Sequence, residues 1–226
     1  MKRTVVVAVA LGLGLSPLTP THAHHVGVFT PKDDDITKNF KDIKFASQAG
    51  RFDVALKLFE EGVVHETMER FEKALPPRLE DHLRAALKTQ DLPGVESRLA
   101  LFLAFMTRER VRTAVGRLRE PRLQSEQRRE QARKLLDAAW RYYNLADFVI
   151  SRQDPKASVT LRLAFEDAQS FLGGTMVDPM WATGRSAPGT TTPPGVSPKG
   201  VRPDDEKAAA ALNLMEGTLD EVLRRG

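Results

Sequence analysis

The sequence predicts an all-α fold: an irregular bundle of about six helices over residues 36–172, then a Pro/Gly-rich linker and a C-terminal amphipathic helix. Two observations predict this fold. Apolar residues recur at the i, i+3 and i+4 spacing of a helix face along most of the chain, and no run shows the alternation of a half-buried strand. Glycine and proline are concentrated at a few positions, which separate one helical run from the next.

The first 23 residues have the pattern of a secretory signal peptide. Lys2 and Arg3 precede a run of 12 mostly apolar residues, and Ala23 is the small residue expected at a cleavage site. The run is shorter than the roughly 20 residues that span a bilayer. We therefore expect a soluble protein exported to the periplasm or the medium, with no transmembrane span in the mature chain and a flexible N-terminus over residues 24–35.

Four helices are predicted in the first half of the mature chain, with glycine or proline between neighbours. Gly50 separates the first helix from the second, and Pro76-Pro77 separates the second from the third, which begins with Pro77. The tetrapeptide DLPG at 91–94 is predicted to form the turn before the fourth helix. The predicted bounds are 36–49, 53–75, 77–90 and 95–119.

The segment LALFLAFM at 99–106, inside the fourth predicted helix, is apolar on every side. A helix of that composition is covered by neighbours all round, so we place it at the centre of the bundle. A fifth helix is predicted over 124–151 and a sixth over 156–172. Asp154 before Pro155 has the pattern of an N-cap followed by proline at the first helical position.

The end of the chain differs in composition. Residues 173–203 contain repeated proline and glycine and few apolar residues, so they are predicted to be a disordered linker or mobile loop. Residues 204–226 are predicted to form a helix that docks on the bundle, because an amphipathic helix needs a partner for its apolar face. That face consists of Ala208, Leu212, Met215, Leu219 and Val222.

The segment AGRFDVALKLFEEGV at 49–63 resembles the second half of a tetratricopeptide unit in Gly50, Phe52, Ala55 and Phe59. The resemblance implies a closely packed helix hairpin, because small residues let two helices approach. The pattern does not recur one repeat length, about 34 residues, to either side, whereas a solenoid needs about three repeats. We therefore expect one such hairpin inside an irregular bundle rather than a tandem array.

A cluster of candidate metal ligands lies in EGVVHETMERFE at 61–72. On one continuous helix, its histidine and three of its glutamates share a face, and the next histidine along the chain is predicted to meet them across the Pro76-Pro77 hairpin. Imidazole and carboxylate groups together bind zinc or iron. HETME lacks the second histidine of the zinc-protease helix, so protease activity is not inferred. The candidates are Glu61, His65, Glu69, Glu72 and His82; the alternative is an ordinary solvated helix surface.

The mature N-terminus offers a second candidate metal site. Cleavage after Ala23 leaves His24-His25 as the first residues, and a free α-amine beside an imidazole chelates copper. Cleavage one residue earlier places His24 and His25 second and third, which is another copper-binding arrangement. The alternative, which we expect, is a flexible segment with no built site.

The segment from Arg108 to Lys134 is strongly basic, with 10 Arg and Lys residues against 4 Glu, although the whole chain has a net charge of only +4. One pole of the bundle is therefore predicted to be basic and to contact an anionic membrane surface or an acidic protein partner. Aromatic residues are scarce there, so nucleic acid is not predicted as a partner. The alternative is a solvated helix tip. The candidate residues are Arg108, Arg110, Arg112, Arg117, Arg119, Arg122, Arg128, Arg129, Arg133 and Lys134.

No motif in the sequence indicates a particular reaction. Tyr143 and Asp147, one helical turn apart, suit a structural hydrogen bond better than a proton relay. The absence of cysteine excludes disulfides, thiol nucleophiles and covalently attached haem. We expect an exported binding or interaction protein without catalytic activity and without a cofactor. The alternative is an extracytoplasmic metal-binding accessory protein for zinc, iron or copper.

Overall fold

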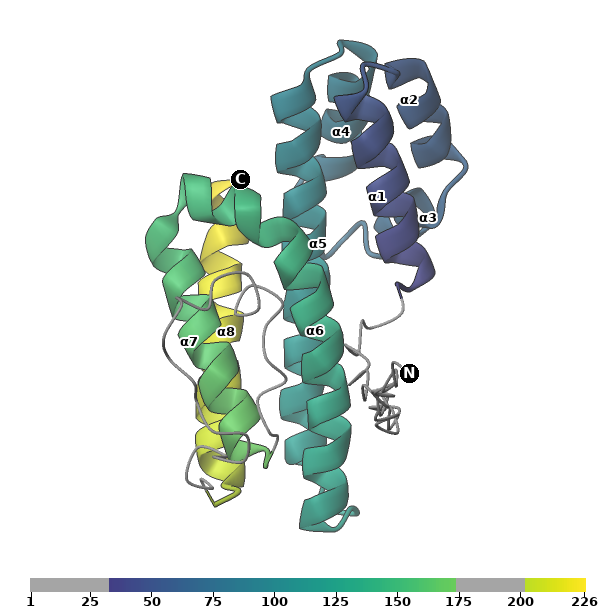
Figure 1. The fold of residues 1–226 in the computed structure, drawn as a ribbon. Helices are drawn as coiled ribbons and strands as arrows, with labels where there is room; N and C mark the ends of the chain where they lie inside the picture. Colours follow the sequence, from purple (N-terminus) through teal and green to yellow (C-terminus); the bar gives the residue numbers. More distant parts are fainter. Residues whose placement is uncertain (1–32, 174–201) are drawn as a thin grey trace, which may run out of the picture. The chain divides into compact units, whose positions relative to one another are not determined.

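The computed structural model describes residues 33–173 and 202–226, and these residues confirm the all-α prediction. They contain no strand and fold into eight helices (Figure 1). The helices are α1 (Asp35–Gln48), α2 (Phe52–Glu60), α3 (Val63–Arg70), α4 (Leu79–Lys88), α5 (Leu92–Leu118), α6 (Ser125–Gln153), α7 (Pro155–Phe171) and α8 (Asp205–Arg225). The predicted signal peptide and nearly all of the predicted linker lie outside the described residues.

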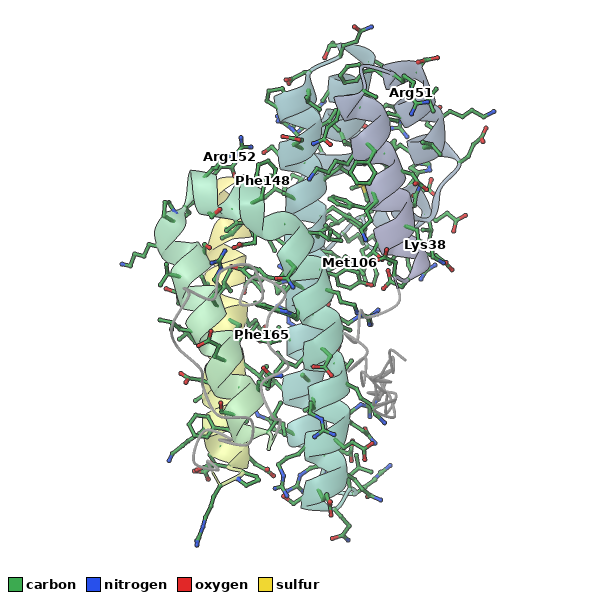
Figure 2. The ribbon with its side chains drawn as sticks, viewed as in Figure 1. Lys38, Arg51, Met106, Phe148, Arg152 and Phe165 are labelled. Atoms are coloured by element: carbon green, nitrogen blue, oxygen red, sulfur yellow. The ribbon has the colours of Figure 1, made fainter. Side chains whose placement is uncertain are left out.

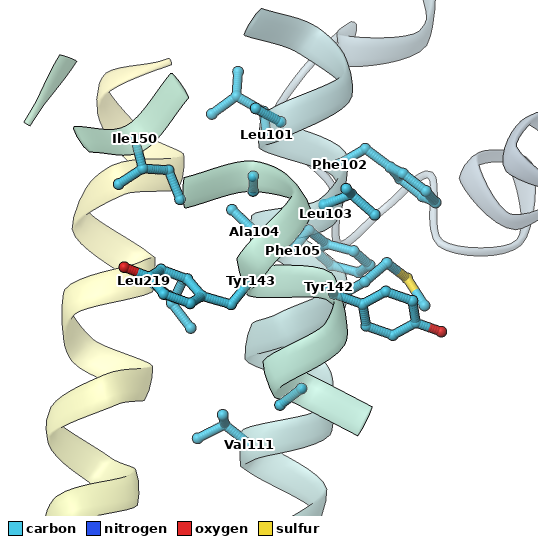
Figure 3. Packing of buried hydrophobic residues seen from close by; sticks show 14 of the residues in the cluster. Leu101, Phe102, Leu103, Ala104, Phe105, Val111, Tyr142, Tyr143, Ile150 and Leu219 are labelled. Carbon is cyan, nitrogen blue, oxygen red and sulfur yellow. The ribbon is translucent and has the colours of Figure 1, made fainter. Parts of the chain in front are cut away.

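Helix α5 is the central element, as predicted. It packs against α1 and α4, which precede it in the chain, and against α6 and α8, which follow it (Figure 1). Every residue of its apolar segment, 99–106, is buried. Figure 3 shows Phe105 of α5, Tyr143 of α6 and Leu219 of α8 contributing to this core. The all-round apolar pattern therefore predicted the position of the helix as well as its existence.

The prediction of one long helix over 53–75 is wrong, because the chain breaks into α2 and α3 at Gly62. The side chain of Asn39, from α1, enters the break. Its Nδ2 donates to the Leu58 carbonyl at 2.8 Å, and its Oδ1 accepts from the Val64 amide at 3.0 Å. A Cβ on Gly62 would lie only 2.3 Å from Asn39 Oδ1. Asn39 thus satisfies both helix ends, and only glycine leaves room for it.

Two other predicted helix starts are also wrong. Pro77 does not begin α4; Arg78 follows in the left-handed conformation, with φ of 60°, and the helix begins at Leu79. DLPG is not a turn between helices, because Asp91 is the N-cap of α5 and accepts from the Gly94 amide at 3.0 Å. In both places proline has two interpretations, turn or first helical turn, which composition alone does not separate.

The helix hairpin expected from the tetratricopeptide-like segment is formed by α1 and α2, which pack against each other. Gly50 lies between them with φ of 73°, a left-handed conformation that favours glycine. Ala55 and Phe59 are completely buried.

The predicted N-cap at Asp154 is confirmed. The Asp154 side chain accepts from the Ala157 amide, and Pro155 is the first residue of α7.

Polar contacts join α1 to α6. The Tyr142 hydroxyl donates to Oδ2 of Asp34, the N-cap of α1, at 2.7 Å. Lys44 and Arg152 both lie over the ring of Phe148, with 4.9 Å and 4.3 Å to its centroid. Figure 2 shows Phe148 and Arg152 close together near the end of α6. These contacts hold the first helix against the sixth, more than 100 residues later in the chain.

Candidate functional site

The fold divides the predicted metal ligands. Glu61 precedes the break at Gly62, and Glu72 follows the end of α3, so neither shares a helix with His65 and Glu69. The predicted face of four ligands is therefore wrong. The error arises from the helix break at Gly62, which the apolar periodicity of the sequence did not indicate.

The guanidinium group of Arg84 occupies the space in front of the His65 ring. Nε2 of His65 lies 3.1 Å from Oε1 of Glu80 and 3.2 Å from Nη2 of Arg84, and Arg84 donates to Glu80 at 2.8 Å. Glu69 lies 3.7 Å from the same nitrogen. The Arg84 guanidinium would repel a metal ion at this position. Across residues 33–173 and 202–226, no three His, Asp or Glu side chains are placed to hold a metal. His24 and His25 lie outside those ranges.

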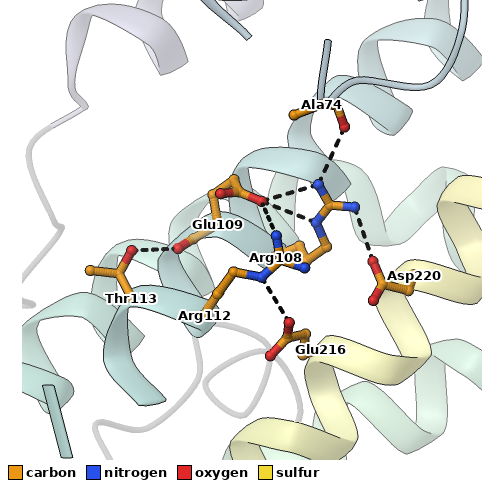
Figure 4. Close-up of polar contacts among 7 residues, drawn as sticks. All are labelled: Ala74, Arg108, Glu109, Arg112, Thr113, Glu216 and Asp220. Carbon is orange, nitrogen blue, oxygen red and sulfur yellow. Dashed lines mark hydrogen bonds and ion pairs between the residues drawn. The ribbon is translucent and has the colours of Figure 1, made fainter. Parts of the chain in front are cut away.

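Helix α8 supplies acids to the basic segment of α5. Arg108 donates from Nη1 to Asp220 at 2.9 Å and from Nη2 to Glu109 at 3.0 Å, and Arg112 donates from Nε to Glu216 at 2.8 Å. Figure 4 shows the Arg108–Asp220 and Arg112–Glu216 pairs bridging α5 and α8, with Glu109 of α5 beside both arginines. Two of the predicted anion-binding side chains are therefore already paired within the fold.

The start of α6 is neutralised in the same way. Oδ2 of Asp205 accepts from Arg128 and Oδ1 accepts from Arg129, both at 3.0 Å, and the Ser125 hydroxyl adds a bond of 3.0 Å. Burial raises the pKa of Asp205, but these hydrogen bonds outweigh burial and lower the pKa below its usual value. Asp205 therefore stays ionised and ties the beginning of α8 to α6.

Other basic side chains of the predicted pole also have partners within the fold, so fewer of them are free than the sequence indicates. Arg110 lies beside the Tyr142 hydroxyl, Arg133 lies near Asp137, and Lys134 is paired with Glu130 at 2.8 Å. Among the predicted anion-binding residues, those that are exposed and form no ion pair within the described part of the chain are Arg117, Arg119 and Arg122.

Tyr143 and Asp147 form part of a structural network between α6 and α7. The Tyr143 hydroxyl donates to Asp147 at 2.5 Å, Ser158 donates to the same oxygen at 2.8 Å, and Arg162 pairs with the other oxygen. Burial, followed by the hydrogen bond to Asp147, raises the pKa of Tyr143. Since Tyr143 and Ser158 are both buried, this network fixes the angle between two helices rather than meeting a substrate.

A cleft of about 610 Å³ lies between α4, α5 and the end of α8. Three segments form it: the loop and α4 residues 74–82, the α5 residues Arg98, Leu101 and Arg108, and the last turns of α8 from Asp220. Its volume lies within the range of about 300–1,000 Å³ that is typical of small-ligand sites. His82, one of the predicted metal ligands, lies in the lining of this cleft. It is not among the residues that contact His65.

The cleft combines an apolar wall with excess positive charge. Its lining contains three arginines, Arg98, Arg108 and Arg224, against two carboxylates, the side chain of Asp220 and the α-carboxylate of Gly226. Asp220 is already paired with Arg108. Arg98 makes only a long bond of 3.4 Å to the Gly94 carbonyl, and Arg224 bonds to a main-chain oxygen of its own helix.

Sequence reasoning missed this site because its three segments are far apart in the chain. Arg98 and Arg224 each look like a surface residue of one amphipathic helix. The available signal was the pair Pro76-Pro77, which precedes α4 and belongs to a run of small or apolar residues, 74–77, that lines the cleft beside α5 and α8.

No helix in the described part of the chain has both the length and the apolar character needed to cross a membrane. Comparisons with protein-family models, curated proteins and solved structures give no match, so the functional argument rests on the residues of this chain.

Proposed function

We propose that this protein is an exported, non-catalytic binding protein that holds a small ligand in the cleft between residues 74–82, α5 and the end of α8. The observation that carries the proposal is the cleft itself: apolar and cationic side chains from three distant segments converge on one space of about 610 Å³. A site assembled from separate elements is the usual form of a ligand pocket. Export is supported by the signal-peptide pattern of the first 23 residues.

The binding role is tested with phenylnaphthylamine, an uncharged probe whose fluorescence rises in apolar surroundings. Ala74 is exposed and lines the cleft, so Ala74→Phe places a ring in the cleft while keeping the main-chain carbonyl of Ala74, which accepts a bond of 3.4 Å from Arg108. Ala210→Phe is the matched control, because Ala210 is exposed on α8 outside the cleft. We expect saturable binding to the wild type and to Ala210→Phe, and weak binding to Ala74→Phe. Equal binding by all three proteins would contradict a ligand site in this cleft.

Export is tested separately by expressing the full chain in a bacterium and sequencing the protein from each compartment. We expect an extracytoplasmic protein that begins at His24. Full-length chain retained in the cytoplasm would contradict export while leaving the cleft binding data intact.

A further inference from the structure

We propose that the ligand is an amphipathic organic carboxylate, with its apolar part against the leucines of the cleft and its carboxylate at Arg98 and Arg224. This inference rests on the proposed function, which by itself requires only that the cleft bind a small apolar molecule. The ligand class follows from two features of the lining, its apolar wall and its distribution of charge.

The apolar wall indicates a ligand with a hydrocarbon body. Leu79, Leu101 and Leu223 are nearly covered by the fold yet contribute to the lining, and Leu75 and Pro76 line it from the loop. Covering such a wall removes apolar surface from water, which favours a hydrocarbon chain or ring over a sugar or an inorganic ion.

The charges indicate that the ligand is an anion. Arg108 is fully engaged by Asp220 and Glu109. Arg98 and Arg224 form no ion pair with any described residue, and the carboxylate of Asp220 that would otherwise attract a cation is occupied. A guanidinium presents parallel N–H donors that match a carboxylate, and Arg98 and Arg224 outnumber the one remaining carboxylate of the lining, that of Gly226, so the cleft favours an anion over a cation.

The combination separates a carboxylate amphiphile from a free phosphate. A site for inorganic phosphate surrounds the ion with donors, commonly main-chain amides at a helix start. Here the guanidinium groups lie beside leucine and proline side chains, and the lining contains two helix ends, the start of α4 at Leu79 and the C-terminal end of α8, whose dipole is unfavourable to anions. The feature that separates the two ligands is the apolar wall, because inorganic phosphate has no hydrocarbon part to cover it, whereas a carboxylate amphiphile covers it and places its charge at Arg98 and Arg224.

The test measures the affinities of three ligands of equal chain length by calorimetry at neutral pH: decanoate, decanol and decylammonium. We expect decanoate to bind at least about tenfold more tightly than decanol, as one charge-assisted hydrogen bond allows, and decylammonium to bind most weakly. Inorganic phosphate is expected not to compete. Equal affinities for the three ligands, or displacement of decanoate by phosphate at similar concentration, would overturn the carboxylate assignment.

Substitution locates the charge interaction. Arg98→Gln and Arg224→Gln are each expected to weaken decanoate binding by about tenfold and to leave decanol binding unchanged. Arg117→Gln is the matched control, because Arg117 is exposed on the same helix as Arg98 but outside the cleft. Arg224 is exposed at the end of α8, so its variant reports on binding even where Arg98→Gln lowers stability. Unchanged decanoate affinity in both variants would overturn the inference.

Failure of this inference and failure of the proposed function give different results. Phenylnaphthylamine binding that Ala74→Phe blocks, together with equal affinities for the three decyl ligands, would retain the cleft as a binding site and reject the carboxylate. Absence of phenylnaphthylamine binding in the wild type would reject the site itself.

Discussion

Arg128 and Asp205 lie 77 residues apart in the sequence, yet Nη2 of Arg128 donates to Oδ2 of Asp205 at 3.0 Å. The same pattern recurs at Arg112–Glu216 and Arg108–Asp220. The acidic residues of α8 thus follow the basic residues of α5 and α6 along much of the length of α8. Part of the charge surplus that the sequence concentrates in residues 108–134 is therefore compensated within the fold.

Asp205→Asn is expected to destabilise the protein by about 1 kcal/mol at neutral pH, because it weakens charge-assisted bonds to two arginines in a group that keeps 24% of its side-chain exposure. The pKa of folded Asp205 is lowered from its usual 3.8, so its stabilising effect is present above that pH and is lost as pH falls through the folded value. Urea unfolding of wild type and variant checks this difference.

The control for Asp205 is Glu206→Gln, since Glu206 is exposed and forms no ion pair within the described residues. Its unfolding midpoint should fall less than that of Asp205→Asn, because both variants lose a negative charge in the first turn of α8 but only Asp205→Asn also loses the bonds to two arginines. A difference between wild type and Asp205→Asn that persists unchanged into strong acid would contradict the role of the ionised carboxylate.

Tyr142→Phe is expected to destabilise the protein by about 1 kcal/mol, because it removes the bond that Tyr142 donates to Asp34. Burial, and then the bond to Asp34, raises the pKa of Tyr142 from 10.0 to about 12. A raised pKa means that the stabilising effect is complete below pH 10.0 and is lost as pH rises through about 12.

Unfolding free energies of wild type and Tyr142→Phe should therefore differ by a constant amount up to pH 10.0 and converge as pH rises from there toward about 12. The comparison between the two proteins cancels the titration of lysines and of Tyr143, which both contain. A constant gap between the two proteins from neutral pH into this alkaline range would disprove the assigned shift.

Gly62→Ala is expected to destabilise the protein by more than about 2 kcal/mol, since its Cβ would lie 2.3 Å from both Asn39 Oδ1 and the Leu58 carbonyl. Gly116→Ala is the matched control. Gly116 lies inside α5 with nothing near its absent Cβ, so alanine should stabilise the protein by about 0.5–1 kcal/mol. Thermal unfolding of both variants measures the contrast, and equal effects would be inconsistent with the packing at the α2–α3 break.

The fold was largely predictable because apolar periodicity reports directly on helices and on burial. Phe40 and Ile43 lie in the core, as expected from their spacing, and the all-apolar segment 99–106 is central. The break at Gly62 was not predictable from periodicity, because Val64 and Met68 keep the apolar spacing across it. What decides the break is a side chain from another helix, Asn39, and such a contact is not encoded locally.

The candidate sites were less predictable for the same reason. The ligand set around His65 assumed a continuous helix, and the anion-binding set treated Arg108 and Arg128 as free charges. These two arginines are not free, because the fold places Asp220 against Arg108 and Asp205 against Arg128, and both acidic residues are distant in the sequence. The cleft depends on three segments meeting, and no single segment carries its signature.

The central claim, a ligand site between residues 74–82, α5 and the end of α8, is tested most directly by NMR of leucine-methyl-labelled protein titrated with decanoate. We expect saturable shifts in the methyl signals of Leu75, Leu101 and Leu223, which line the cleft, and none in Leu136 and Leu161, which are buried elsewhere. Uniform small shifts across all leucines, or shifts confined to leucines outside the cleft, would contradict the account.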